Sequence, residues 1–168
     1  MRFMWRWAST LVVGAIVIST PAALEAQDGV RLSRHLISAN PFGLLVDWFN
    51  AEYEHTASDS ATVGVGGSFF SDGGDDYVNA DVFYRFYPAG RALEGFSFGV
   101  KVGVTRGPSA RSRFGVGVDT NWSWLLGKRD TFYVGAGFGL KRLYGTNDAE
   151  FDREYVPTIR IINIGFAF

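Results

Sequence analysis

The chain has 168 residues, with 16 basic and 17 acidic side chains and a formal net charge of −1. This balance gives no electrostatic reason for binding nucleic acid, which calls for an excess of positive charge. The sequence contains no cysteine, which excludes disulfides and thiolate chemistry, and its length suits one domain.

The N-terminus has the layout of a secretory signal peptide. Positive charge at Arg2 and Arg6 precedes an apolar stretch over residues 7–18, and small residues follow it. This stretch is too short to cross ~30 Å of hydrocarbon comfortably, so a membrane anchor helix is the weaker alternative. We expect residues 1–26 to be removed and residues 27–168 to form one domain.

The rest of the chain alternates between apolar residues and small or polar ones. In residues 96–104, Phe and Val occupy one parity, whereas Ser, Gly and Lys occupy the other. Because alternate residues of a strand point to opposite faces, each such run predicts a strand with one apolar face. Turn-forming residues separate the runs. The expected strands cover residues 31–41, 46–57, 61–71, 76–88, 94–106, 112–126, 130–144 and 155–168.

The length and composition of these strands favour a membrane protein. Most are 11–15 residues long, about twice the usual length in soluble proteins. Their second face is mostly Gly, Ser and Asn, which is a poor coat in water but fits the inside of a narrow barrel. The sequence therefore predicts an all-β fold, an eight-stranded antiparallel up-and-down transmembrane β-barrel. A soluble periplasmic lipocalin-like barrel that binds a ligand is the alternative, because its strands alternate too.

Aromatic residues on the apolar parity are expected at one end of this barrel. If the chain starts in the periplasm, the periplasmic ends of the last five strands each carry one aromatic residue. Such a girdle is typical of transmembrane barrels. Its residues are Phe86, Phe96, Trp124, Phe132 and Phe168.

The last stretch, INIGFAF, places Ile162, Ile164, Phe166 and Phe168 on the apolar parity. A closing strand that ends on an aromatic residue resembles the C-terminal signature of bacterial outer-membrane barrels. The mature chain as a whole is similar to the small eight-stranded OmpA/OmpX-like family. The resemblance implies a Gram-negative outer-membrane location, a monomer, and recognition by the barrel-assembly machinery during insertion.

The inward parity carries four acidic and four basic side chains. Because unpaired buried charge is costly, we expect them to form a hydrogen-bonded network. Eight strands enclose a lumen only wide enough for side chains, which argues against a general porin. A structural plug is the plainer interpretation, and a switchable gate for small ions is the alternative. The residues are Glu52, Glu54, Asp81, Arg85, Lys101, Asp119, Lys141 and Arg160.

Arg160 departs from the alternation. Counted back from Phe168, it would face lipid. A β-bulge near Ile161 and Ile162 would turn it inward. Snorkelling of its long side chain to the outer interface is the alternative.

Further arginines are expected near the outer rim of the barrel. A guanidinium group at that height would meet the phosphates of lipopolysaccharide, which it can bind through two hydrogen bonds. Simple snorkelling at the headgroup boundary is the alternative. The candidate lipopolysaccharide contacts are Arg106, Arg111, Arg113 and Arg142.

We do not expect an enzyme. The chain has two histidines, His35 and His55, and both are expected near the periplasmic rim, opposite the leaflet that holds lipid A. We predict no catalytic residue, no metal site and no cofactor. A structural or surface-interaction role is expected, and an outer-leaflet lipid-modifying enzyme is the alternative.

Overall fold

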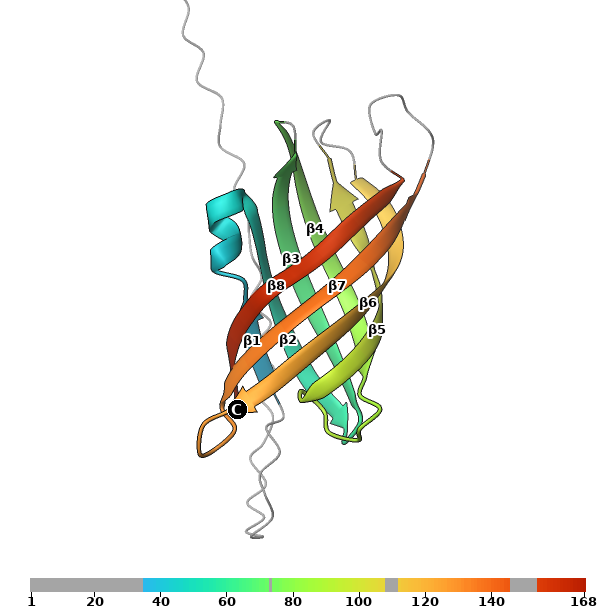
Figure 1. Cartoon of the computed structure of the whole chain (residues 1–168). Helices are drawn as coiled ribbons and strands as arrows, with labels where there is room; N and C mark the ends of the chain where they lie inside the picture. The colour runs from blue at the N-terminus through green and yellow to red at the C-terminus, as the bar shows by residue number, and fades with distance from the viewer. Residues whose placement is uncertain (1–34, 73, 108–111, 146–153) are drawn as a thin grey trace, which may run out of the picture. The chain divides into compact units, whose positions relative to one another are not determined.

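The computed structural model describes residues 35–72, 74–107, 112–145 and 154–168, so the predicted signal peptide lies outside the described residues. The described part is an all-β, closed up-and-down barrel in which neighbouring strands are antiparallel and follow sequence order (Figure 1). This confirms the predicted barrel architecture. The strands are β1 His35–Ala39, β2 Trp48–Ser58, β3 Ala61–Asp72, β4 Asp75–Phe86, β5 Gly95–Arg106, β6 Ser112–Leu126, β7 Phe132–Tyr144 and β8 Tyr155–Ala167.

The first strand can be compared with the prediction at its end alone. β1 ends at Ala39 instead of at residue 41, and residues 31–34 lie outside the described part of the chain. The other seven strands begin and end within two residues of the expected positions. Within the described residues, alternation alone therefore located every strand.

The expected turn after β1 is a 3-10 helix, η1 Phe42–Val46. Pro41 stands before it with φ of −70°, and proline suits a helix start because it has no backbone N–H to satisfy. Asp47 ends it in the left-handed conformation, with φ of 52°. A side chain at Gly43 would place its Cβ 1.5 Å from the carbonyl oxygen of Trp48, so only glycine fits this turn. Among the described residues, no helix is long and apolar enough to cross a membrane.

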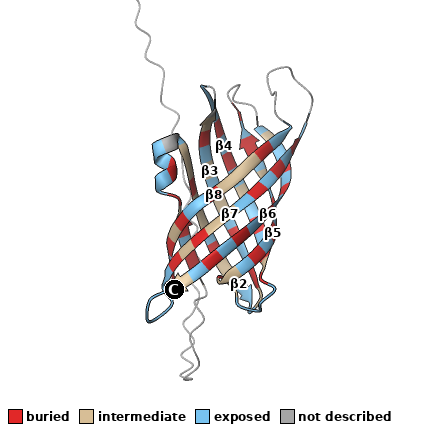
Figure 2. Cartoon of the chain, in the orientation of Figure 1, coloured by how far each residue is buried: buried red, intermediate tan, exposed pale blue. Residues whose placement is uncertain are grey.

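Buried and exposed residues alternate along the strands (Figure 2). On β5, Val100 and Val102 are exposed, whereas Ser97 and Lys101 are buried. The outer wall is therefore apolar, and polar side chains fill the interior.

Two apolar clusters lie inside the barrel, one near each end. At the end that holds the start of β1 and the end of β8, Leu36, Tyr133 and Ala167 pack with Leu93 from the β4–β5 connection. At the opposite end the cluster contains Phe70, Tyr77, Leu143 and Val156. The charged side chains lie between these two layers.

A β-bulge on β8 resolves the parity of Arg160. The register between β7 and β8 shifts between Gly135 and Gly137, where Ile161 and Ile162 of β8 oppose a single residue. Both isoleucines are exposed, and Arg160 is only 2% exposed, in the interior. The structure thus has the bulge and not a snorkelling arginine.

Candidate functional site: the interior charge network

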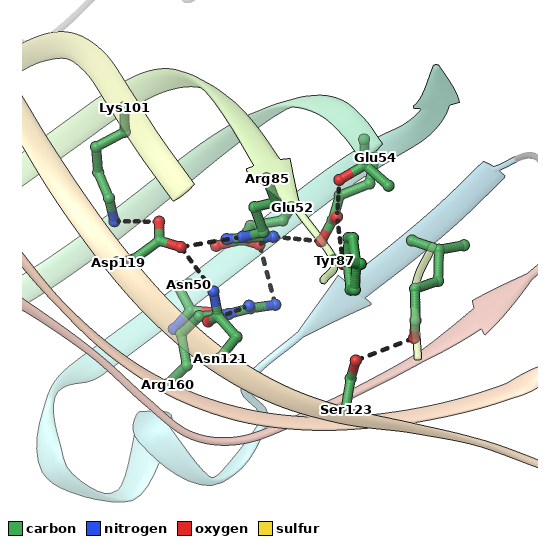
Figure 3. Close-up of polar contacts among 12 residues, drawn as sticks. Asn50, Glu52, Glu54, Arg85, Tyr87, Lys101, Asp119, Asn121, Ser123 and Arg160 are labelled. Atoms are coloured by element: carbon green, nitrogen blue, oxygen red, sulfur yellow. Dashed lines mark hydrogen bonds and ion pairs between the residues drawn. The ribbon is translucent and has the colours of Figure 1, made fainter. Parts of the chain in front are cut away.

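Arg85 of β4 lies at the centre of the interior (Figure 3). Its Nη1 lies 2.9 Å from Glu52 Oε2 and also contacts Glu54 Oε1. Its Nε lies 3.2 Å from Asp119 Oδ1. One guanidinium therefore joins two carboxylates of β2 to one of β6.

Lys101 and Arg160 supply the remaining positive charge. Lys101 Nζ lies 3.2 Å from Asp119 Oδ2, and Arg160 Nη2 lies 3.0 Å from Glu52 Oε2. With Arg85, three cations then face three carboxylates, and the network is neutral. Neutrality matters because an uncompensated buried charge costs several kcal/mol, on the order of 3–5 when one partner is removed.

Asn121 links the two halves of this network (Figure 3). Its Nδ2 donates to Asp119 Oδ1 at 2.6 Å, and its Oδ1 accepts from Arg160 Nη1 at 2.7 Å. The facing position on β7 is Gly137, where a Cβ would lie 2.0 Å from Asn121 Oδ1. Glycine at this inward position thus leaves room for the contacts that Asn121 makes with Asp119 and Arg160.

Asp81 and Lys141 form a separate ion pair, with 2.7 Å between Oδ1 and Nζ. Lys141 is buried, whereas the Asp81 side chain keeps 14% of its surface exposed. The structure therefore brings all eight predicted inward charges into the interior, six in one network and two in this pair.

Several residues that contribute to the interior were not predicted from the sequence. Thr62 Oγ1 donates to Glu54 Oε2 at 2.9 Å, and Tyr87 Oη does so at 3.5 Å. Tyr87 shares the parity of Arg85 and could have been found by counting along β4. Leu93 could not, because it lies in a predicted turn, with φ of 69°, and reaches the interior only through the path of that connection.

The five predicted girdle residues all lie toward the same end of the barrel. They come from the ends of β4, β6 and β8 and from the starts of β5 and β7. Neighbouring outward aromatics extend the band, since Trp122 lies 6.4 Å from both Phe96 and Trp124, measured between ring centroids. Exposed aromatics also occur toward the opposite end, which the sequence analysis did not single out. They are Phe42 of η1 and, on the strands, Phe69, Phe114, Tyr144 and Tyr155.

The predicted rim arginines differ in their surroundings. Arg142 Nη2 lies 2.6 Å from Glu154 Oε1. Arg113 is opposite Thr105, which is fully buried, so its position has inward parity. Arg106 is exposed at the end of β5, and Arg111 lies outside the described residues.

The interior groups are arranged to neutralise one another. The described contacts of Glu52, Glu54 and Asp119 are with cations and with amide or hydroxyl donors. Such contacts tie β2, β4, β5, β6 and β8 together across the barrel and obstruct its interior.

Comparison of the chain with protein-family models, with curated proteins and with solved structures finds no match. A function must therefore be argued from the barrel itself.

Proposed function

We propose that the protein is an outer-membrane β-barrel that crosses the bilayer with its strands and has a structural or surface-interaction role. The observation that carries the proposal is the polarity of the wall. Outward Val100 and Val118 are 54% and 61% exposed, whereas inward Arg85 and Lys141 are each 1% exposed. In water this arrangement would expose apolar surface and bury charge, and both cost free energy. In hydrocarbon the same apolar wall is favourable, because it meets an apolar surrounding. A closed barrel also pairs its backbone groups, which hydrocarbon requires.

The height of the apolar wall supports a membrane-spanning role. On β5 the outward residues from 96 to 104 cover about 27 Å along the strand, which is roughly 20 Å across a bilayer at the tilt usual for such barrels. Phe occupies one end of this run, Val the middle, and Arg106 follows at the other end. An aromatic end, an aliphatic middle and a cationic end suit, in turn, one interface, the core and the other interface of a membrane.

The contents of the barrel support a filled lumen and argue against a general porin. An apolar cluster lies near each end, and a neutral network of large charged side chains lies between them. A hydrated solute would have to displace both apolar layers and separate buried ion pairs.

The proposal includes export through residues 1–26, monomeric insertion by the barrel-assembly machinery, and an OmpA/OmpX-like affiliation. Its support is the signal-like N-terminus, the aromatic Phe168 after the closing strand, and the simple barrel topology. No cofactor and no catalytic role are proposed.

Depth-resolved fluorescence quenching tests the membrane assignment. After removal of the signal peptide the tryptophans are Trp48, Trp122 and Trp124. With Trp48 replaced by Phe, the protein is folded into phospholipid vesicles that carry bromine at a defined acyl-chain depth. We expect the two girdle tryptophans to be quenched more by bromine near the headgroups than by bromine at mid-chain.

A matched variant should show the opposite order of quenching by the two bromine positions. When the sole tryptophan is moved to Val102, in the middle of β5, mid-chain bromine should quench it more strongly. Equal and weak quenching at both depths, with recovery of a soluble monomer without detergent, would contradict the membrane assignment. In the same vesicles a small sugar should cause no osmotic swelling, and porin-like swelling would contradict the filled lumen.

A further inference from the structure

Two histidines meet on the outer wall beside the seam where the barrel closes. His35 of β1 stands directly opposite His55 of β2. Their ring centroids are 4.8 Å apart, and their Nδ1 atoms are 3.4 Å apart. Tyr53, on the same face of β2, places its hydroxyl oxygen 2.7 Å from His35 Nδ1. β2 therefore brings two further donor atoms within 3.4 Å of His35 Nδ1.

The separation of the two Nδ1 atoms has a specific meaning for metal coordination. Two Zn–N bonds of about 2.0–2.1 Å at the tetrahedral angle place their nitrogens about 3.3–3.4 Å apart. A right-angled pair, as in octahedral or square-planar sites, would need about 2.9 Å. The observed 3.4 Å matches the tetrahedral case without movement of the backbone.

The surroundings hold these rings in place while leaving them accessible. The facing backbone positions belong to a regular antiparallel ladder, and the His35 ring stacks on Phe168 with 5.5 Å between centroids. Both histidines are only partly buried, and they lie beside Phe168 at the girdle end of the wall, where the proposed membrane meets water and ions. An accessible pair of imidazoles held by a regular ladder is a suitable zinc ligand set.

We propose that His35 and His55 bind a zinc ion, with the Tyr53 hydroxyl as the nearest third donor and solvent at the remaining positions. Among the described residues, no group of three or more His, Cys, Asp or Glu side chains is placed to hold a metal ion. This site is of a different kind, because it consists of a histidine pair and a phenol. Its open positions make the bound ion exchangeable.

The location gives the ion a structural consequence. The described part of β1 covers His35–Ala39 and pairs with the closing strand β8 through residues 36–39. An ion held by His35 and His55 would fasten β1 to β2 at the start of this seam. Because the two ligands are adjacent only in the folded barrel, zinc should raise its resistance to unfolding.

Calorimetric titration of ZnCl₂ into the untagged, detergent-solubilised protein tests the site. The sequence has two histidines and no cysteine, so histidine-dependent binding reports this pair alone. We expect one ion per chain, and at least about tenfold weaker binding in His55→Gln and in His35→Gln. The matched control, Asp75→Asn with Asp76→Asn, changes an exposed acidic hairpin at the opposite end and should bind zinc as the wild type does.

Replacing zinc with cobalt(II) allows the coordination geometry of the bound ion to be read from its visible absorption. Intense visible absorption, as tetrahedral cobalt shows, is expected in the wild type and should be lost in His55→Gln. Because His35 also stacks on Phe168, His55→Gln is the deciding variant, and its folded state is checked by the gel mobility of unheated samples. The proposal is overturned if the wild type binds no zinc, if folded His55→Gln binds it as tightly as the wild type, or if cobalt gives the weak spectrum of an octahedral ion.

Discussion

The ion pair between Arg160 and Glu52 joins β8 to β2 across the short strand β1, with 3.0 Å between Nη2 and Oε2. Asn50 of β2 crosses the same seam, because its Nδ2 donates to the carbonyl oxygen of Ile159 at 3.5 Å. Among the described residues, the backbone ladder between β1 and β8 pairs residues 36–39 of β1, and His35 adds two backbone hydrogen bonds to Phe168. Interior side chains thus reinforce closure at the seam where the described backbone ladder has the fewest pairs.

The first prediction compares two arginines. Arg160→Met should lower the free energy of unfolding by about 1–3 kcal/mol, because Asn121 loses a donor while Glu52 keeps Arg85. Arg142→Met is the matched control and should change it little, since the Arg142–Glu154 pair is about half exposed. Urea titration in lipid vesicles, followed by the gel mobility of unheated samples, measures both. Equal losses would mean that the interior pair adds nothing to closure.

The second prediction concerns the isolated pair. Lys141→Met should destabilise the barrel by about 1–3 kcal/mol, because Asp81 loses its ion-pair partner. Lys101→Met should cost less, because Asp119 keeps Arg85 and Asn121. Adding Asp81→Asn to Lys141→Met should restore part of the stability, with a coupling of about 0.5–3 kcal/mol in a double-mutant cycle. Strict additivity would show that the two charges are not coupled.

The third prediction separates inward from outward glycines. Gly137→Ala should destabilise the barrel, because the new Cβ would lie 2.0 Å from Asn121 Oδ1 and would displace the amide from Arg160. Gly67→Ala should stay within about 0.5 kcal/mol of the wild type, since its Cβ would meet nothing closer than 3.6 Å. Urea unfolding of the two variants decides the matter. A similar loss in both would indicate a general backbone effect of the added methyl group and no steric role for Gly137.

The fourth prediction tests Phe168 as an assembly signal. Phe168→Ala keeps the two 2.9 Å backbone hydrogen bonds to His35 and removes the ring. We expect a lower outer-membrane level in cells but near-normal refolding into detergent. Phe166→Ala, at a neighbouring outward aromatic of β8, is the control and should insert normally. Quantitative blotting of membrane fractions gives the comparison, and equal levels would rule out a special role for Phe168.

The fifth prediction concerns lipopolysaccharide at the rim. Arg106→Gln with Arg142→Gln should reduce the lipopolysaccharide that copurifies with the protein and leave the folded gel band intact, because guanidinium groups at this height can bind phosphate. Phosphate assay of the washed protein measures the change. If the double variant retains as much lipopolysaccharide as the wild type, these arginines serve as interfacial anchors and do not bind lipopolysaccharide specifically.

The strand pattern is a local property, and local chemistry was enough to predict it. Alternation with period two reports which residues share a face, and turn residues report where a strand ends. Seven strands and the inward parity of seven charged residues followed from this pattern, and Arg160 needed only the bulge that its own sequence suggested. The sequence also contained an apparent signal peptide, which remains a prediction outside the described residues.

The partners of these side chains were decided by the tertiary structure. Which carboxylate meets Arg85 depends on the register of four strands and on the curvature of the closed sheet, and alternation within one strand carries no information about either. The same holds for Leu93, which enters the interior from a connection, and for His35 and His55, which are 20 residues apart in the chain and meet only because β1 and β2 pair at that register. Parity is set by the backbone of each residue, whereas contacts are set by how distant strands align.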